Sequence, residues 1–134
     1  MALKEFGLST FEKLKSRKEI KEVLSLGIEI LSADKKIKAI YLAEKNDKKT
    51  TVKITPAVYK KLGCAVWRNR VKRLIRESYR LNKKELLKKI DQKNLKLKII
   101  FSPQKISEDK NKHVSLMQIM PGMLDLIKKI TERI

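Results

Sequence analysis

Cysteine is nearly absent from the sequence, since Cys64 is the single one among 134 residues. No disulfide can therefore form within the chain, and a reducing, cytoplasmic setting is expected. No apolar run approaches the ~20 residues that span a bilayer, and residues 1–19 lack the apolar segment of a secretory signal. Aromatic residues make up only 5% of the chain, so the core is expected to be aliphatic.

The sequence also lacks the groupings that carry protein-based chemistry. His113, the one histidine, stands in a polar stretch and is expected at the surface. No cysteine and histidine spacing suits zinc, and no serine, threonine or cysteine has a base beside it. We therefore expect no catalytic residue, metal ligand or cofactor site among the side chains, and Cys64 is expected to be a small packing residue.

What the chain does have is positive charge. Lysine and arginine number 34 against 15 acids, which gives a net charge of +19. A chain this small cannot spread such an excess without attracting polyanions, and nucleic acid is the commonest partner of that kind. The alternative is a domain with an unusually solvated lysine surface.

The apolar pattern predicts one domain over residues 1–134. A capping box, Ser16-x-x-Glu19, begins a helix that Gly27 ends. Further helices are predicted over 65–81, with a possible continuation to Ile90 and a break near Asn82, and from 116 onward; strands are predicted at 28–30, 36–44, 50–55 and 95–101. The order α-β-β-β-α-β-α predicts an α+β two-layer sandwich, in which a four-stranded sheet packs against helices.

Residues 64–84, CAVWRNRVKRLIRESYRLNKK, are the most informative segment. At helical spacing one face collects the apolar and small side chains over about a third of the circumference, enough to dock on a sheet. This face consists of Trp67, Val71, Leu74, Ile75, Ser78 and Leu81. The remaining faces carry the cations Arg68, Arg70, Lys72, Arg73, Arg76 and Arg80, with Asn69 among them.

The cations of this segment have the spacing and chemistry of a phosphate-binding row. Arg68, Lys72 and Arg76 are four residues apart, so their heads are expected about 6 Å from one another, comparable with successive phosphates. Arginine offers planar, bidentate donors, and Asn69 can bind a base, a sugar hydroxyl or a hydrated metal ion. A merely solvated helix face would mix signs at i,i+4, whereas Glu77 is the only acid between Arg68 and Lys84.

The stretch KKLGCAVWRNRVKRLIRESYR (60–80) resembles the signature of the bacterial ribonuclease P protein family. It has a Lys-Lys-Leu-Gly lead-in, an Ala-Val, and then Arg-Asn-Arg-x-x-Lys/Arg-Arg-x-x-Arg-Glu. The order of predicted elements follows that family over nearly the whole length. The resemblance implies a subunit that assists a catalytic RNA in removing the 5′ leader of precursor tRNA, with magnesium ions required by the RNA and none bound by the protein.

The resemblance also implies roles for particular residues. The cations expected to bind RNA are Lys60, Lys61, Arg68, Arg70, Lys72, Arg73, Arg76 and Arg80, together with Asn69. Of these, Arg70 and Arg73 would meet the catalytic RNA. A leader cleft between the sheet and the motif helix would contain Arg68, Asn69, Lys72, Arg76, Tyr41, Ile20 and Leu24. The family usually has phenylalanine where Ile20 and Leu24 stand, and neither aliphatic side chain offers a ring on which a base could stack. A left-handed β-α-β crossover is implied as well.

Two other functions compete with this interpretation. One is a structural RNA-binding protein of ribosomal or assembly type, which the same charge would suit. The other is a basic amphipathic helix acting on membranes or acidic proteins, which needs a free apolar face, whereas the core needs this one. For the same reason Trp67 is expected in the core rather than stacked on a base.

Overall fold

The computed structural model describes residues 13–46 and 50–134. Its elements are α1 (Arg17–Leu26), β1 (Ile28–Leu31), β2 (Ile37–Lys45), β3 (Thr51–Pro56), the short 3-10 helix η2 (Lys60–Leu62), α2 (Ala65–Asn82), α3 (Lys84–Lys93), β4 (Leu95–Pro103) and α4 (Leu116–Arg133). The predicted α+β class and order of elements are confirmed. The predicted break is real, so the long helix becomes α2 and α3, which meet at Lys83.

The four strands form one mixed sheet in the order β1-β2-β4-β3. Strand β2 is antiparallel to both β1 and β4, whereas β3 lies parallel to β4 at the edge. The connection from β3 to β4 contains α2 and α3, because two parallel neighbours need a long crossover. Pro56 ends the edge strand β3, where a missing N–H is tolerated.

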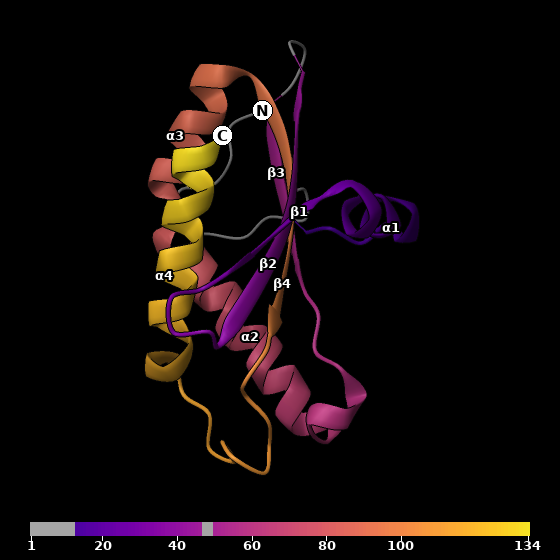
Figure 1. Ribbon diagram of the computed structural model, residues 1–134, viewed down its shortest axis with the longest axis vertical. Helices are drawn as coiled ribbons and strands as arrows, with labels where there is room; N and C mark the ends of the chain where they lie inside the picture. The colour runs from indigo at the N-terminus through magenta and orange to yellow at the C-terminus, as the bar shows by residue number, and fades with distance from the viewer. Residues whose placement is uncertain (1–12, 47–49) are drawn as a thin grey trace.

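Helices lie on both faces of the sheet (Figure 1). The larger core lies between the sheet and α2, α3 and α4, and includes Leu97, Ile99 and Phe101 of β4. On the opposite face α1 packs over Ile100 of the same strand through Val23. Side chains alternate across a strand, and β4 is buried on both sides, with a continuous apolar run at residues 99–101.

The helix α1 begins and ends as its sequence predicts. Ser16 is the N-cap and its hydroxyl accepts from the Glu19 amide, while Gly27 is the C-cap. Glu19 also bridges two lysines of the sheet, with its carboxylate 3.5 Å from Nζ of Lys53 and 3.6 Å from Nζ of the buried Lys98. A buried ammonium needs a nearby carboxylate, so this contact helps to fix α1 on the sheet.

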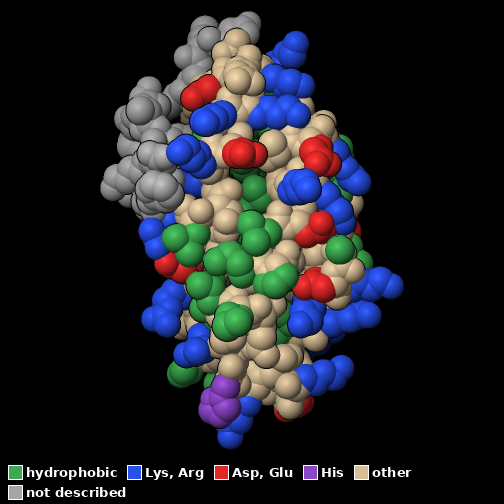
Figure 2. All heavy atoms as spheres, turned by 90° about the vertical axis from the view of Figure 1, so that its left-hand side faces the viewer, with side chains coloured by type: hydrophobic (Ala, Val, Ile, Leu, Met, Phe, Trp, Pro, Cys, Tyr) green, Lys and Arg blue, Asp and Glu red, His purple; other side chains and the backbone are tan. Residues whose placement is uncertain are grey.

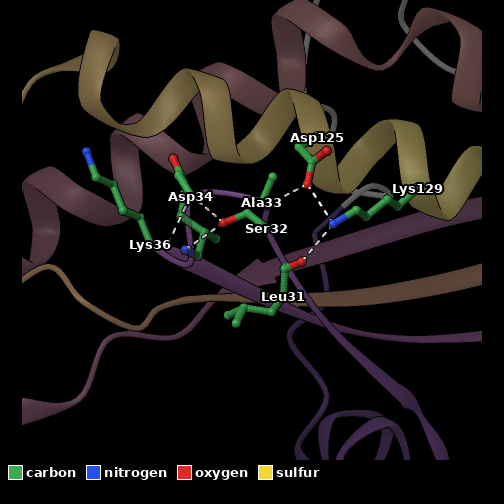
Figure 3. Close-up of polar contacts among 8 residues, drawn as sticks. Leu31, Ser32, Ala33, Asp34, Lys36, Asp125 and Lys129 are labelled. Carbon is green, nitrogen blue, oxygen red and sulfur yellow. Dashed lines mark hydrogen bonds and ion pairs between the residues drawn. The ribbon is translucent and has the colours of Figure 1, made fainter.

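The terminal helix α4 is tied to the turn between β1 and β2 (Figure 3). The Asp125 carboxylate accepts from the amide of Ala33 at 2.8 Å and pairs with Lys129 at 2.9 Å, and Lys129 donates to the carbonyl of Leu31 at 3.0 Å. Burial acts to raise the pKa of Asp125, but the bonds from Lys129 and Ala33 outweigh it and hold that pKa below its ordinary value. This tie is therefore intact at neutral pH and weakens only as acid protonates the carboxylate.

Among the described residues, no helix has the length and apolar character needed to cross a membrane.

Candidate nucleic-acid interface

Helix α2 is fixed to the core by the face that its sequence predicts, with one shift. Trp67, Val71, Leu74, Ile75 and Ser78 are buried as expected. Leu81, however, is 40% exposed, and Tyr79 is fully buried in its place, tilted against Phe101 with ring centroids 6.4 Å apart. The expectation for Leu81 is wrong because the larger Tyr79 ring reaches the sheet near the end of the helix and turns that side of α2 inward.

Both arginines of the Arg-Asn-Arg motif are held by main-chain carbonyls. Nε of Arg68 donates to the carbonyl of Gly63 at 3.1 Å, and Nε of Arg70 donates to the carbonyl of Val114 at 2.7 Å. Within residues 13–46 and 50–134, the terminal nitrogens of these two guanidinium groups have no hydrogen-bond partner. Each group is therefore oriented by one nitrogen and keeps its bidentate end available for a phosphate.

The other predicted cations divide into two kinds. Glu77 holds Arg80 through both carboxylate oxygens in an i,i+3 ion pair, and the hydrogen bond from Arg80 holds the pKa of Glu77 below its ordinary value. Arg80 thus has an internal carboxylate partner, and its contact with RNA stays a prediction. The remaining candidates are exposed or half-buried and have no ion pair within the described part of the chain; they are Lys60, Lys61, Asn69, Lys72, Arg73 and Arg76.

The cations of α2 point to two different sides. Arg70 bonds to Val114, which lies just before α4, so its side of the helix faces α4. Arg68 bonds to Gly63 in the lead-in from β3, and Lys72 and Arg76 follow it at helical spacing. Since α4 packs over β2 and β3 is the opposite neighbour of β4, the row Arg68, Lys72 and Arg76 lies toward the β3 edge of the sheet.

A pocket of about 260 Å³ opens on the α1 face of the sheet. One wall is α1, and the floor comes from β2, β3 and β4. Its lining residues are Ile20, Leu24, Lys38, Ile40, Thr55, Pro56, Ala57, Tyr59, Ile100 and Ser102. Two of the predicted cleft residues, Ile20 and Leu24, therefore do line a common pocket, which combines apolar side chains with hydroxyl and ammonium groups.

Tyr41 lies on the side of the sheet that faces the motif helix, but it is buried there and does not line an open cleft. Lys38 and Ile40 of β2 face the pocket, so Tyr41 points to the opposite face, where its side chain is only 4% exposed within the larger core. The space between α2 and the sheet is likewise filled, since Val71 and Ile75 are fully buried there. The pocket thus lies under α1, and the predicted cleft between the sheet and the motif helix is closed.

Tyr59 is the aromatic residue of the pocket lining, and the sequence does not single it out. It is 57% exposed, whereas the other aromatic side chains in residues 13–46 and 50–134 are almost completely buried. It directly precedes Lys60 and Lys61 in the segment that leads from β3 to α2. An aromatic residue just before two lysines, after the proline that ends an edge strand, is the signal that could have found it.

Cations alone do not locate an interface on this molecule. The face formed by α3 and α4 also carries lysine and arginine side chains around a central apolar area (Figure 2). A hollow of about 610 Å³ lies between these two helices, with Leu124, Ile127, Lys84 and Glu85 in its lining, and it mixes charges of both signs. The α2 surface differs in having like charges at fixed spacing on a helix whose opposite side is buried in the core.

The remaining sequence candidates are placed as follows. His113 is exposed, as predicted, and Trp67 is buried with its indole N–H bonded to the carbonyl of Asn111 at 3.0 Å. Cys64 was expected to pack, but it is exposed at the N-cap of α2, where its thiol lies 3.3 Å from the Glu108 carboxylate. Among the described residues, no three acidic, cysteine or histidine side chains group as metal ligands would.

Comparisons with known proteins agree with the motif. A family model described as Ribonuclease P matches residues 8–119. The chain belongs to the ribonuclease P protein family. It is 29% identical to the ribonuclease P protein component of Clostridium novyi over 88% of this chain and 92% of that protein, and 31% identical to that of Clostridium botulinum over 87% and 92%. It is therefore a ribonuclease P protein subunit, with the RNA-binding and tRNA 5′-processing role of that family.

Solved ribonuclease P proteins share this fold. The protein from Thermotoga maritima aligns with a TM-score of 0.66 and 22% identity, covering 88% of this chain and 96% of that one. The protein from Staphylococcus aureus aligns with a TM-score of 0.65 and 23% identity, covering 90% and 95%. These likenesses confirm the α+β fold.

Proposed function

We propose that this ribonuclease P protein binds a catalytic RNA and the 5′ leader of precursor tRNA at once, and so assists the RNA in hydrolysing the phosphodiester bond that frees the leader. The RNA and its magnesium ions supply the chemistry. The protein supplies two cationic sides of one helix. The side that carries Arg70 and Arg73 meets the catalytic RNA, and the row Arg68, Lys72 and Arg76 meets the leader.

The observation that carries this proposal is the fixed display of guanidinium groups on α2. A helix with a buried stripe cannot rotate, so its cations keep constant positions. Carbonyls further orient Arg68 and Arg70 while leaving their terminal nitrogens open. Groups ordered before binding lose less conformational entropy when they meet a phosphate. The arrangement therefore favours a single-stranded polyanion held at a set register over diffuse attraction.

The leader has a continuous route from this row to the pocket under α1. The row lies toward the β3 edge, and the lead-in Tyr59-Lys60-Lys61 continues from the end of β3 to the start of α2. Tyr59 stands at the pocket and both lysines are exposed. A strand that follows the row would thus pass two further cations and reach an aromatic ring beside an apolar floor, the combination that single-stranded nucleic acids favour.

The test is cleavage of precursor tRNA by the catalytic RNA with and without this protein. At low magnesium, where the RNA alone is slow, we expect the protein to restore leader removal, because it replaces part of the counterion charge at the substrate. Binding of RNA without any stimulation would instead indicate the structural RNA-binding role. A response that does not weaken with added salt would contradict polyanion binding altogether.

Tyr59 provides a prediction about the pocket. Replacing Tyr59 by alanine should weaken the affinity of the holoenzyme for precursor tRNA by about 1–3 kcal/mol, the contribution of stacking one base on an aromatic ring. Tyr59→Phe keeps the ring and should stay close to the wild-type affinity. Because the side chain is exposed, neither change should alter the melting temperature much. Equal losses for precursor and mature tRNA, measured by titration, would rule out a contact with the leader.

A further inference from the structure

Glu108 binds the lead-in to α2 on both sides of Gly63. Its amide donates to the carbonyl of Leu62 at 2.7 Å, and its carboxylate accepts from the amide of Cys64 at 2.9 Å and lies 3.3 Å from the Cys64 thiol. The two chain segments touch so closely that a Cβ at Gly63 would lie 2.9 Å from Cβ of Glu108. The peptide between Leu62 and Cys64 is therefore held from the loop between β4 and α4.

The same peptide orients Arg68. The carbonyl of Gly63 accepts from Nε of Arg68 at 3.1 Å, so a short series of contacts runs from Glu108 through Gly63 to a guanidinium group of the proposed leader row. Arginine has five donor hydrogens, of which the Nε contact uses one. Moving the Gly63 carbonyl would redirect the remaining four.

The negative charge of Glu108 opposes the binding of RNA to the surface on which it lies. Its carboxylate stands at the start of α2, next to the lead-in that carries the exposed Lys60 and Lys61. Hydrogen bonds from the amide and then the thiol of Cys64 hold the pKa of Glu108 below its ordinary value, so the group is ionised at neutral pH. A carboxylate at that place repels phosphates, and its presence calls for a compensating role.

We propose that Glu108 is a positioning residue for RNA binding, which fixes the Gly63 carbonyl and thereby the direction of Arg68. This role rests on the proposed contact of Arg68 with RNA. The cost of one negative charge on the binding surface is offset by an arginine that is oriented before RNA arrives. The same contacts place Cys64 at the N-cap of α2, so the first turn of the motif helix and its first cation are set together.

If Glu108 acts only through its charge, its removal should raise the affinity for RNA. If it positions Arg68, its removal should lower that affinity. Removing any acid from a protein of charge +19 should strengthen RNA binding if only charge matters. If Glu108 positions Arg68, Glu108→Ala should instead weaken affinity for the leader-bearing precursor by about fivefold or more. Asp109→Asn is the matched control, because this neighbouring acid is exposed and should bind RNA as tightly as the wild type or more tightly.

Two further variants separate positioning from a general structural defect. Glu108→Gln keeps an acceptor oxygen for the Cys64 amide and should recover most of the affinity that Glu108→Ala loses. In an Arg68→Ala background, Glu108→Ala should cause little further loss, since the group that it positions is gone. Losses that add in the double variant, or tighter binding by Glu108→Ala, would overturn the proposal. Failure of the wild-type protein to bind precursor tRNA would instead overturn the proposed function.

Discussion

The double substitution Arg68→Ala and Lys72→Ala should weaken binding of precursor tRNA to the holoenzyme by about 10- to 100-fold, while binding of mature tRNA changes far less. Each side chain is expected to supply one charge-assisted contact to a leader phosphate, and two such contacts of roughly 0.7–1.4 kcal/mol each give this factor. Mature tRNA has no leader to lose. Equilibrium titration of both ligands at one salt concentration measures the difference.

The salt dependence of binding provides a second readout of the same variant. Each phosphate contact to a single strand contributes about 0.7 to the slope of log affinity against log salt, so the double variant should lower that slope by about 1.4. Lys88→Ala on α3 removes an exposed charge away from the row and is the control. A comparable loss for Lys88→Ala, or equal losses for precursor and mature tRNA, would show that net charge rather than the α2 row matters.

The sequence predicts α2 well because its signal is local. The buried stripe and the cations alternate with the helical period, and this fixes which side chains can reach solvent. Periodicity in the sequence does not assign side chains to a face where helices cover both faces of a strand, as they do for β2. Residues 39–42 are apolar at both odd and even positions, since α1 covers one face of the sheet and α2 and α4 cover the other. Periodicity therefore cannot assign Tyr41 to a face. The family resemblance assigns it to the side of the motif helix, where it does lie, but buried in the core rather than exposed in a cleft.

The residues that sequence reasoning missed at the site act through contacts between segments far apart in the sequence. Val114 and Glu108 belong to a polar loop that shows no periodic pattern, yet their contacts orient Arg70 and the lead-in to Arg68. Nothing local marks such residues, because a carbonyl acceptor has no sequence signature. Arg80 shows the reverse case. Its acidic partner Glu77 stands three residues earlier, so helical spacing alone could have predicted this ion pair.

Trp67→Ala should have the largest effect on stability and should show whether anchoring itself matters for RNA binding. The indole is 3% exposed and donates to the Asn111 carbonyl, so its removal leaves a cavity and an unpaired acceptor. Losing a buried tryptophan costs about 3–5 kcal/mol of unfolding free energy. Val66→Ala, at an adjacent position that is 80% exposed, should change it by less than about 0.5 kcal/mol. Denaturant titration compares the two.

The RNA-binding consequence of Trp67→Ala distinguishes an anchored row of cations from a simple sum of charges. The variant keeps every lysine and arginine, so under conditions where it remains folded its salt slope should match that of the wild type. Its affinity for precursor tRNA should nevertheless fall, because a loosened first turn must order Arg68 and Arg70 during binding and loses that entropy then. Unchanged affinity in a destabilised but folded variant would show that the cations of α2 need no rigid support.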